Sequence, residues 1–288
     1  MPEEIVGGCG RFYSNRVNMF IDEFEAGWLD ELDRWRDELK DNTRLYLLID
    51  GVFVPGLQRR FIGALGEHAV SLLFETLPAC TEAVKDASPF VLQYPKDVQA
   101  VGDILKLCSG WPMVSVLETS EVLDQLAARL AAWCVVENDG QRFNFRFPDT
   151  RRLPGIYNAL TPQQQGELAG AAVRWSYIDR QGMWQSLALS SAASPVQERP
   201  QELSDEQFGR MVNDSEADEM IARLDYSGNR PAGKQSNAYA IVAHALSVAN
   251  ERELVNDQRL KWVMECARKG SAIGDDETRR DEWRIAAD

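Results

Sequence analysis

The sequence predicts an α/β (α+β) protein, with an N-terminal lobe in which helices flank a mixed β-sheet and a smaller all-helical C-terminal lobe. Through Trp133, short apolar runs typical of strands alternate with segments of helical periodicity, and antiparallel strand patterns follow. Beyond residue 200 the patterns are helical. We therefore expect five segments: an N-terminal helical extension at 1–43, an α/β domain at 44–189, a linker at 190–200, a helical lobe at 201–270 and a charged flexible tail at 271–288.

Composition and charge restrict the classes of partner. The 288 residues are 44% hydrophobic and include eight Trp and eleven Phe, as in a folded protein. The formal charge of −14 disfavours nucleic acid and anionic membranes, which are bound by clustered Lys and Arg. No apolar run approaches the roughly 20 residues of a membrane span, and the first ten residues lack the basic and apolar regions of a signal peptide. We expect a cytoplasmic protein without membrane insertion.

Large apolar residues recur at steps of three and four between Asn18 and Lys40, which predicts one long helix. In the ordinary interpretation this stripe packs on a core. The alternative is a partner-binding helix, because so many large aromatics lie outside the main fold. The residues of the stripe are Phe20, Phe24, Trp28, Leu32, Trp35 and Leu39.

Three short runs predict the strands of the main sheet. Arg44–Ile49 is continuously apolar after its first residue, which is typical of a central strand buried on both faces. Asp50 follows it at the carboxyl end, where open sheets often carry functional groups. The favoured interpretation is a turn residue that binds its own backbone. A second strand lies within Ser88–Pro95 and includes Phe90, and a third covers 113–118.

Three helices are expected between these strands and after them. One opens at Pro55, one is capped by Asp97 and one starts at Ser120. The first carries an apolar stripe that continues through His68 to Leu72. On such a stripe, His68 is interpreted as a half-buried structural histidine rather than a base or a metal ligand.

The stretch from 134 to 189 predicts two hairpins separated by a helix. The Asn-Asp-Gly turn at 138–140 joins two strands, and the second alternates polar and apolar residues as far as Phe147. Thr161 begins a capping box with Pro at the first helical position. A second hairpin turns around 180–182, and its last strand includes Trp184.

The C-terminal lobe is expected to contain four helices. Ser204 begins a capping box that predicts a short helix. Further helices cover about 215–224, 237–252 and 257–269, and Gly270 stops the last of them.

The sequence contains none of the motifs that would indicate catalysis. Nucleophile-elbow, phosphate-loop and zinc-protease motifs are absent, the five cysteines form no CxxC pair, and there are two histidines, His68 and His244. Each histidine lies on a predicted apolar helix face. We therefore expect no enzyme, no cofactor and no metal site.

Charged residues gather where the strand that contains Phe147 ends. In the structural interpretation, an Arg–Asp pair with bidentate geometry fixes the strand to the next helix, and Arg146 and Asp149 hold this corner. In the functional interpretation, the charges form the rim of a groove that recognises a partner's backbone or acidic groups. The candidate partner-binding or cleft-supporting residues are Asp50, Phe90, Arg146, Asp149, Arg151, Arg152 and Trp184.

Five motifs follow one another in a fixed order: Tyr46–Gly51, Ser88–Leu92, Asp139-Gly140, Phe145-Arg146-Phe147 and Asp149-Thr150-Arg151. This order of motifs resembles the effector-adaptor chaperones of bacterial type VI secretion. One departure is Thr150, since many members have Pro between the Asp and the Arg. The resemblance covers residues 44–189 and extends more weakly through the helical lobe.

The resemblance implies that the protein binds one cognate toxin effector in the cytoplasm and delivers it to the VgrG spike, without a cofactor or nucleotide. Two lobes joined by a linker can form a cleft. Our hypothesis is that this cleft takes an amphipathic or apolar N-terminal segment of the effector, as a helix in a groove. The competing hypotheses are an immunity protein that inhibits a toxin, and a hydrolase that depends on His68 or Asp50.

Overall fold

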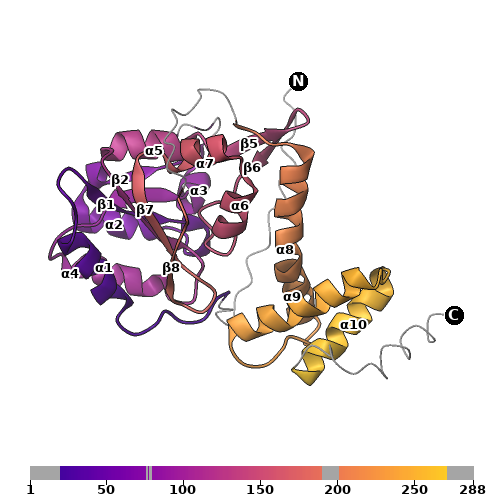
Figure 1. Ribbon diagram of the computed structural model, residues 1–288. Coiled ribbons are helices and arrows are strands. Elements are labelled where there is room, and N and C mark those ends of the chain that lie inside the picture. Colours follow the sequence, from indigo (N-terminus) through magenta and orange to yellow (C-terminus); the bar gives the residue numbers. More distant parts are fainter. Residues whose placement is uncertain (1–19, 76, 78–79, 190–200, 271–288) are drawn as a thin grey trace.

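The computed structural model describes residues 20–75, 77, 80–189 and 201–270. The predicted linker at 190–200, the predicted tail at 271–288 and residues 1–19 of the predicted extension lie outside the described residues. An α/β body is followed by three helices that stand beside it and extend away from it (Figure 1). This arrangement confirms the predicted fold class.

Six strands form the main sheet, in the order β2-β3-β1-β4-β7-β8, and every pairing in it is antiparallel. β1 is interior, as predicted, with Leu47 opposite Leu92 on one side and Val116 on the other. The strands are β1 (Arg44–Ile49), β2 (Val70–Leu72), β3 (Phe90–Gln93), β4 (Val114–Thr119), β7 (Ala172–Ile178) and β8 (Trp184–Ser186).

A small second sheet supplies the parallel pairing. Its strands are β5 (Val135–Asn138), β6 (Gln141–Asn144) and β9 (Gln201–Glu202), and β5 pairs in parallel with β9. The sequence predicts no strand after residue 200, and this prediction is wrong because the two residues of β9 are too few to show a period of two. The predicted hairpin turn is confirmed: Asp139 and Gly140 have φ angles of 48° and 70°, as a two-residue hairpin loop requires.

The helices surround the main sheet and then leave it. Those of the α/β body are α1 (Trp28–Asp37), α2 (Leu57–Leu65), α3 (Glu82–Ala87), α4 (Gln99–Leu105), α5 (Leu123–Ala131), α6 (Leu153–Ala159) and α7 (Pro162–Ala169). Short 3₁₀ turns are η1 (Gly51–Phe53), η2 (Glu67–Ala69) and η3 (Lys106–Cys108). The last three helices are α8 (Asp205–Tyr226), α9 (Gln235–Glu251) and α10 (Asn256–Lys269).

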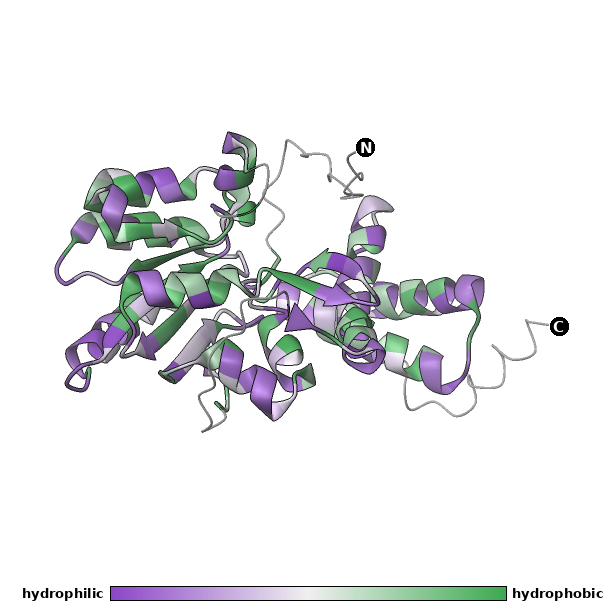
Figure 2. Cartoon of the chain, turned by 90° about the horizontal axis from the view of Figure 1, so that it is seen from above, coloured by the Kyte–Doolittle hydropathy of each residue, from purple (hydrophilic) through white to green (hydrophobic). Residues whose placement is uncertain are grey.

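Each face of the main sheet has its own hydrophobic core, because successive side chains of a strand point to opposite faces. In β1, Leu45, Leu47 and Ile49 belong to one core, while Tyr46 and Leu48 belong to the other. Figure 2 shows hydrophobic residues concentrated along strands of the main sheet, whereas the surrounding helices alternate between hydrophobic and hydrophilic residues. The continuous apolar run of this strand is therefore explained by burial on both sides.

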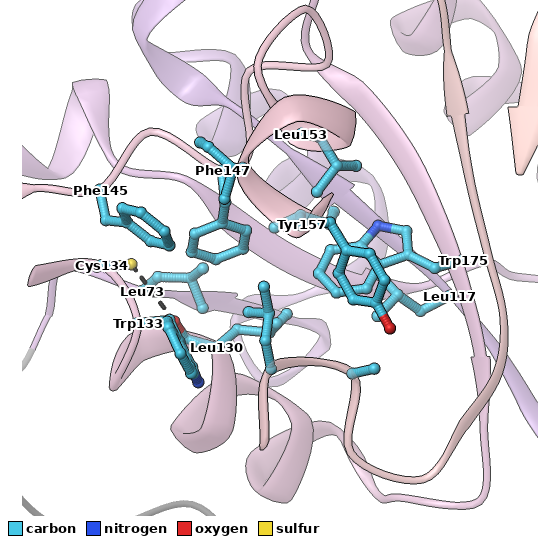
Figure 3. Packing of buried hydrophobic residues seen from close by; sticks show 14 of the residues in the cluster. Leu73, Leu117, Leu130, Trp133, Cys134, Phe145, Phe147, Leu153, Tyr157 and Trp175 are labelled. Atoms are coloured by element: carbon cyan, nitrogen blue, oxygen red, sulfur yellow. Dashed lines mark hydrogen bonds between the residues drawn. The ribbon is translucent and has the colours of Figure 1, made fainter. Parts of the chain in front are cut away.

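The second core collects the aromatic residues around the two hairpins (Figure 3). Phe145 packs against Trp133 with ring centroids 5.8 Å apart, and Phe147 meets Trp175 edge to face at 6.3 Å. β6 ends at Asn144, so both phenylalanines lie beyond the strand that was predicted to contain them. They still point into the core, because the Phe145 N–H donates to the carbonyl of Cys134 at 2.8 Å and prolongs the pairing.

The predicted helix at 18–40 is shorter than expected. Within the described part, α1 begins only at Trp28, after Gly27 with φ 87°. Residues 20–26 run as a loop whose N–H groups donate to the α/β body, among them Glu25 to the carbonyl of Gly182 at 2.9 Å. Ile21 and Leu32 are fully buried in the core that also contains β1. Residues 20–43 are thus part of the α/β body rather than an extension.

Two further helices differ from their predictions. α2 ends before Gly66, so His68 lies in η2 and is exposed, while Leu72 lies in β2. The short helix expected after Ser204 continues through the segment predicted as the next helix and forms the 22-residue α8. The turns of α8 before and after residues 213–215 pack on two different hydrophobic clusters, and the helix is continuous between them.

α8 contributes to both the α/β body and the C-terminal lobe. Near its start, Phe208 packs against Phe143 at 4.6 Å, and the Gln207 side-chain amide donates to the carbonyl of Ala159 at 3.0 Å. Its second half joins α9 and α10 in a third hydrophobic cluster around Trp262. Gly270, with φ 68°, ends α10 as predicted.

The capping box at Ser204 is expected to stabilise the first turn of α8, and a substitution can test this. The Ser204 hydroxyl accepts from the Gln207 N–H at 3.2 Å, and the Gln207 side chain accepts from the Ser204 N–H at 3.0 Å. Ser204→Ala is expected to lower the free energy of unfolding by about 1 kcal/mol, measured by urea denaturation. Ser247→Ala, at an exposed position inside α9, is the control and should be close to neutral. Equal losses in the two variants would contradict the capping role.

Candidate functional site

Asp50 lies at the carboxyl end of β1 and is almost completely buried. Its carboxylate accepts from the Arg146 guanidinium at 2.8 Å and, as the cap of η1, from the Val52 N–H at 3.3 Å. Burial raises the pKa of Asp50, the Arg146 charge opposes this, and the charge of Asp149 adds to it. Arg146 thus pairs with a residue that lies 96 positions away in the sequence.

Asp149 pairs with Arg151, and this is the bidentate Arg–Asp pair that the sequence predicts at the end of the strand. The guanidinium donates to both carboxylate oxygens, at 3.0 and 2.7 Å, and the Arg151 N–H donates to the carboxylate at 3.1 Å. Both side chains are largely buried. A two-point contact of this kind fixes the orientation of a guanidinium. The turn between β6 and α6 thus presents Arg151 in one orientation.

Three arginines of the α/β body contact the carboxylate of Asp218 in α8. Arg180 donates to its two oxygens at 2.8 and 2.9 Å, Arg152 approaches to 3.3 Å and Arg151 to 3.6 Å. Arg152 also donates to the backbone carbonyl of Asp214 at 2.8 Å. We call the following residues the junction cluster, in which Arg151, Arg152 and Arg180 join the α/β body to α8 through Asp218: Asp50, Arg146, Asp149, Arg151, Arg152, Arg180 and Asp218.

The three arginines around Asp218 lower its pKa. Burial alone would raise its pKa, but the hydrogen bonds from Arg180 and the charges of Arg151, Arg180 and Arg152 outweigh burial and hold the pKa below its ordinary value of 3.8. A carboxylate with a lowered folded-state pKa stabilises the fold above its unfolded-state pKa and loses that contribution as the pH falls through the folded-state pKa. The junction cluster is therefore an acid-sensitive contact.

Because the pKa of Asp218 is lowered, its contribution to the unfolding free energy should depend on pH. The difference in unfolding free energy between the wild type and Asp218→Asn should be largest above about pH 5 and shrink as the pH falls below 3.8. Chemical denaturation of both proteins between pH 6 and pH 3 measures it. Glu219→Gln, at the exposed neighbouring position, is the control. A difference that is constant across this range would contradict an ionised Asp218 in the folded protein.

Three aromatic rings lie beside the junction cluster, and none of them is among the candidate residues predicted from the sequence. Phe20, Phe53 and Trp111 lie with their ring centroids 5.6–6.0 Å apart, and we call them the aromatic trio. The Arg151 guanidinium lies 5.0 Å from the Phe20 ring centre, and that of Arg146 lies 5.7 Å from Phe53. Phe53, which ends the short turn after Asp50, was the feature of the sequence that could have indicated this aromatic group.

Two of the seven candidate residues lie elsewhere. Phe90 is fully buried in β3 and packs against Phe61. Trp184 lies between Trp28 and Trp35, and its indole N–H donates to the Trp28 carbonyl at 3.0 Å. Phe90 is a core residue of the α/β body, and Trp184 is half-buried and packs against the same core. The remaining five candidates belong to the junction cluster, and their role towards a partner stays a prediction.

A cleft of about 690 Å³ lies near the start of β1, at the opposite end of the strand from Asp50. Its lining includes Arg36, Leu45, His68, Tyr94 and Lys96. Among the described residues, no group of three or more His, Cys, Asp or Glu side chains is arranged to hold a metal ion. No helix in the described part of the chain has the length and apolar character needed to cross a membrane.

Comparison with known families gives one match. The family model described as "Domain of unknown function (DUF4123)" matches residues 45–167. The matched stretch contains Asp50, Arg146, Asp149, Arg151 and Arg152, whereas Arg180 and α8 follow it. Comparisons with curated proteins and with solved structures return no match.

Proposed function

We propose, from the premise that residues 45–167 belong to the DUF4123 family of type VI secretion effector adaptors, that this chain binds a cognate toxin effector and promotes its loading onto the VgrG spike. The family match confirms the resemblance seen in the sequence, and it carries the proposal. Binding of the effector's N-terminal segment and delivery in the cytoplasm belong to the proposal as well.

The geometry of the site favours binding over catalysis, and we propose a function without an enzymatic step. The carboxylates of Asp50, Asp149 and Asp218 are each engaged by at least one guanidinium. Paired charges of this kind hold elements in register. A rigid corner between the α/β body and α8 is suited to presenting a surface to another protein.

Co-expression tests the proposal. The chain is expressed with the toxin encoded beside it, the toxin carrying an inactivating substitution, and the mixture is separated by affinity and size-exclusion chromatography. The expected result is a stable complex, together with loss of toxin secretion when the gene of this chain is deleted and recovery on complementation. Secretion of the spike protein itself is the control and should continue in the deletion strain.

Two outcomes would overturn the proposal. A toxin that stays soluble and is secreted normally without this chain excludes the adaptor role. Protection of cells that produce active toxin, with secretion unchanged, assigns the immunity role instead.

A further inference from the structure

We infer that the aromatic trio and Arg146 form one docking surface for a partner segment in which an aromatic or aliphatic side chain lies beside a carboxylate. The inference rests on the proposed adaptor function and names the chemistry that this surface selects. It is carried by an exposed apolar platform, a guanidinium with spare donors and a rigid support beneath both.

The apolar half of the surface is partly open to solvent, since Phe53 and Trp111 are half-buried and Phe20 is exposed. Phe20 is 42% exposed, and Val52, which precedes Phe53 in η1, is 37% exposed. Large aromatic side chains at a surface provide much contact area with few rotatable bonds, so they are favoured at binding sites. Phe20, Phe53 and Trp111 come from three separate segments of the chain. Their convergence at one place therefore depends on the fold.

The platform is rigid. The Phe20 N–H donates to the Gly110 carbonyl at 3.0 Å, and the Met113 N–H donates to the Trp111 carbonyl at 2.9 Å. Gly51 of η1 packs so closely that a Cβ added to it would overlap the Ser88 carbonyl oxygen. A preformed surface avoids much of the entropic cost of ordering side chains on binding. The rings are thus placed before a partner arrives.

Arg146 supplies the polar half. Its side chain is 39% exposed, and among the described residues its guanidinium makes one hydrogen bond, to Asp50. A guanidinium has five N–H donors, so Arg146 retains donors for a carboxylate, which it can bind at two points. Arg151 differs, since Asp149 and Asp218 engage it from two sides and its side chain is 11% exposed.

Charge complementarity selects the occupant. Arg146 repels a basic segment at this surface, while a carboxylate beside an apolar side chain contacts the guanidinium and the rings together. The rest of the chain disfavours acidic segments, because the formal net charge is −14. An acidic and apolar segment is therefore drawn to this exposed arginine rather than to the acidic surface in general.

The test uses the full chain and the inactivated toxin encoded beside it, with affinity measured by isothermal titration calorimetry. Phe20→Ala and Arg146→Lys are each expected to weaken binding about tenfold, as for central interface residues. Lysine keeps the positive charge beside Asp50 but loses the planar fork. Tyr226→Ala removes an aromatic ring that is 87% exposed at the end of α8, and it should change affinity less than about twofold. Melting temperatures verify that every variant folds.

Synthetic 20-residue peptides that cover the toxin sequence then identify the segment. The expected peptide contains a carboxylate next to aromatic or aliphatic residues, and replacing that carboxylate by an amide should remove the difference between wild type and Arg146→Lys. Toxin that fails to bind the wild-type chain overturns the adaptor function itself. Toxin that binds the wild type, Phe20→Ala and Arg146→Lys equally overturns the docking surface alone, and so does selection of a basic peptide.

Discussion

Asp218→Ala is expected to remove about 3 kcal/mol of unfolding free energy and to release α8 from the α/β body. The carboxylate is largely buried and faces Arg151, Arg152 and Arg180. In this variant, Arg151 still forms its ion pair with Asp149, and Arg152 still donates to the backbone carbonyl of Asp214. Arg180 loses the only carboxylate it contacts among the described residues, and leaving a largely buried charge unpaired is costly.

Chemical denaturation and hydrogen exchange measure this effect. The free energy of unfolding should fall, and amides of α8 between Asp214 and Leu224 should exchange faster in the variant. Glu219→Ala, one position further along the same helix and exposed, is the matched control and should lose less than about 0.5 kcal/mol. Unchanged exchange in α8 would show that the junction cluster does not hold this helix.

Gly182→Ala is expected to cost about 3 kcal/mol and to detach the segment that precedes α1. Gly182 has φ 78°, which an alanine adopts with strain. A Cβ there would also overlap the carbonyl oxygen of Glu23, and the Glu25 N–H donates to the Gly182 carbonyl at 2.9 Å. Relief of the overlap must move either the β7–β8 turn or residues 22–25.

Gly140→Ala separates the two causes. Gly140 has φ 70° in the β5–β6 turn, and a Cβ added there meets no atom within 4 Å. It should therefore cost about 1 kcal/mol, from backbone strain alone. Urea denaturation followed by tryptophan fluorescence measures both variants. Equal losses would exclude the close approach of Glu23 as the cause at Gly182.

The sequence predicted those features that neighbouring residues determine. The strand at 44–49 follows from an apolar run, and the helix start at Thr161 follows from its capping box, in which the Gln164 N–H donates to the Thr161 hydroxyl at 3.3 Å. The α10 end at Gly270 is equally local. Such signals need only a few consecutive residues, so a single sequence contains them in full.

Features that depend on distant partners were missed. The spacing of Phe20, Phe24 and Trp28 is that of a helix, yet hydrogen bonds to Gly110 and Gly182 hold this segment as a loop. The partner of Arg146 could not be chosen from its neighbours in a chain with 45 acidic residues. Asp218 was missed because α8 was divided in two. In one continuous helix, Asp214 and Asp218 lie one turn apart on the same face.

The shared helix α8 has a consequence for cooperativity. Its first turns pack on the α/β body through Phe208, while Met220 and Leu224 belong to the cluster of the C-terminal lobe. Melting either core removes packing that keeps the helix formed, and the loss passes to the other core along about 33 Å of helix. We therefore expect the α/β body and the C-terminal lobe to unfold as one thermodynamic unit, in a single calorimetric transition in which van't Hoff and calorimetric enthalpies agree.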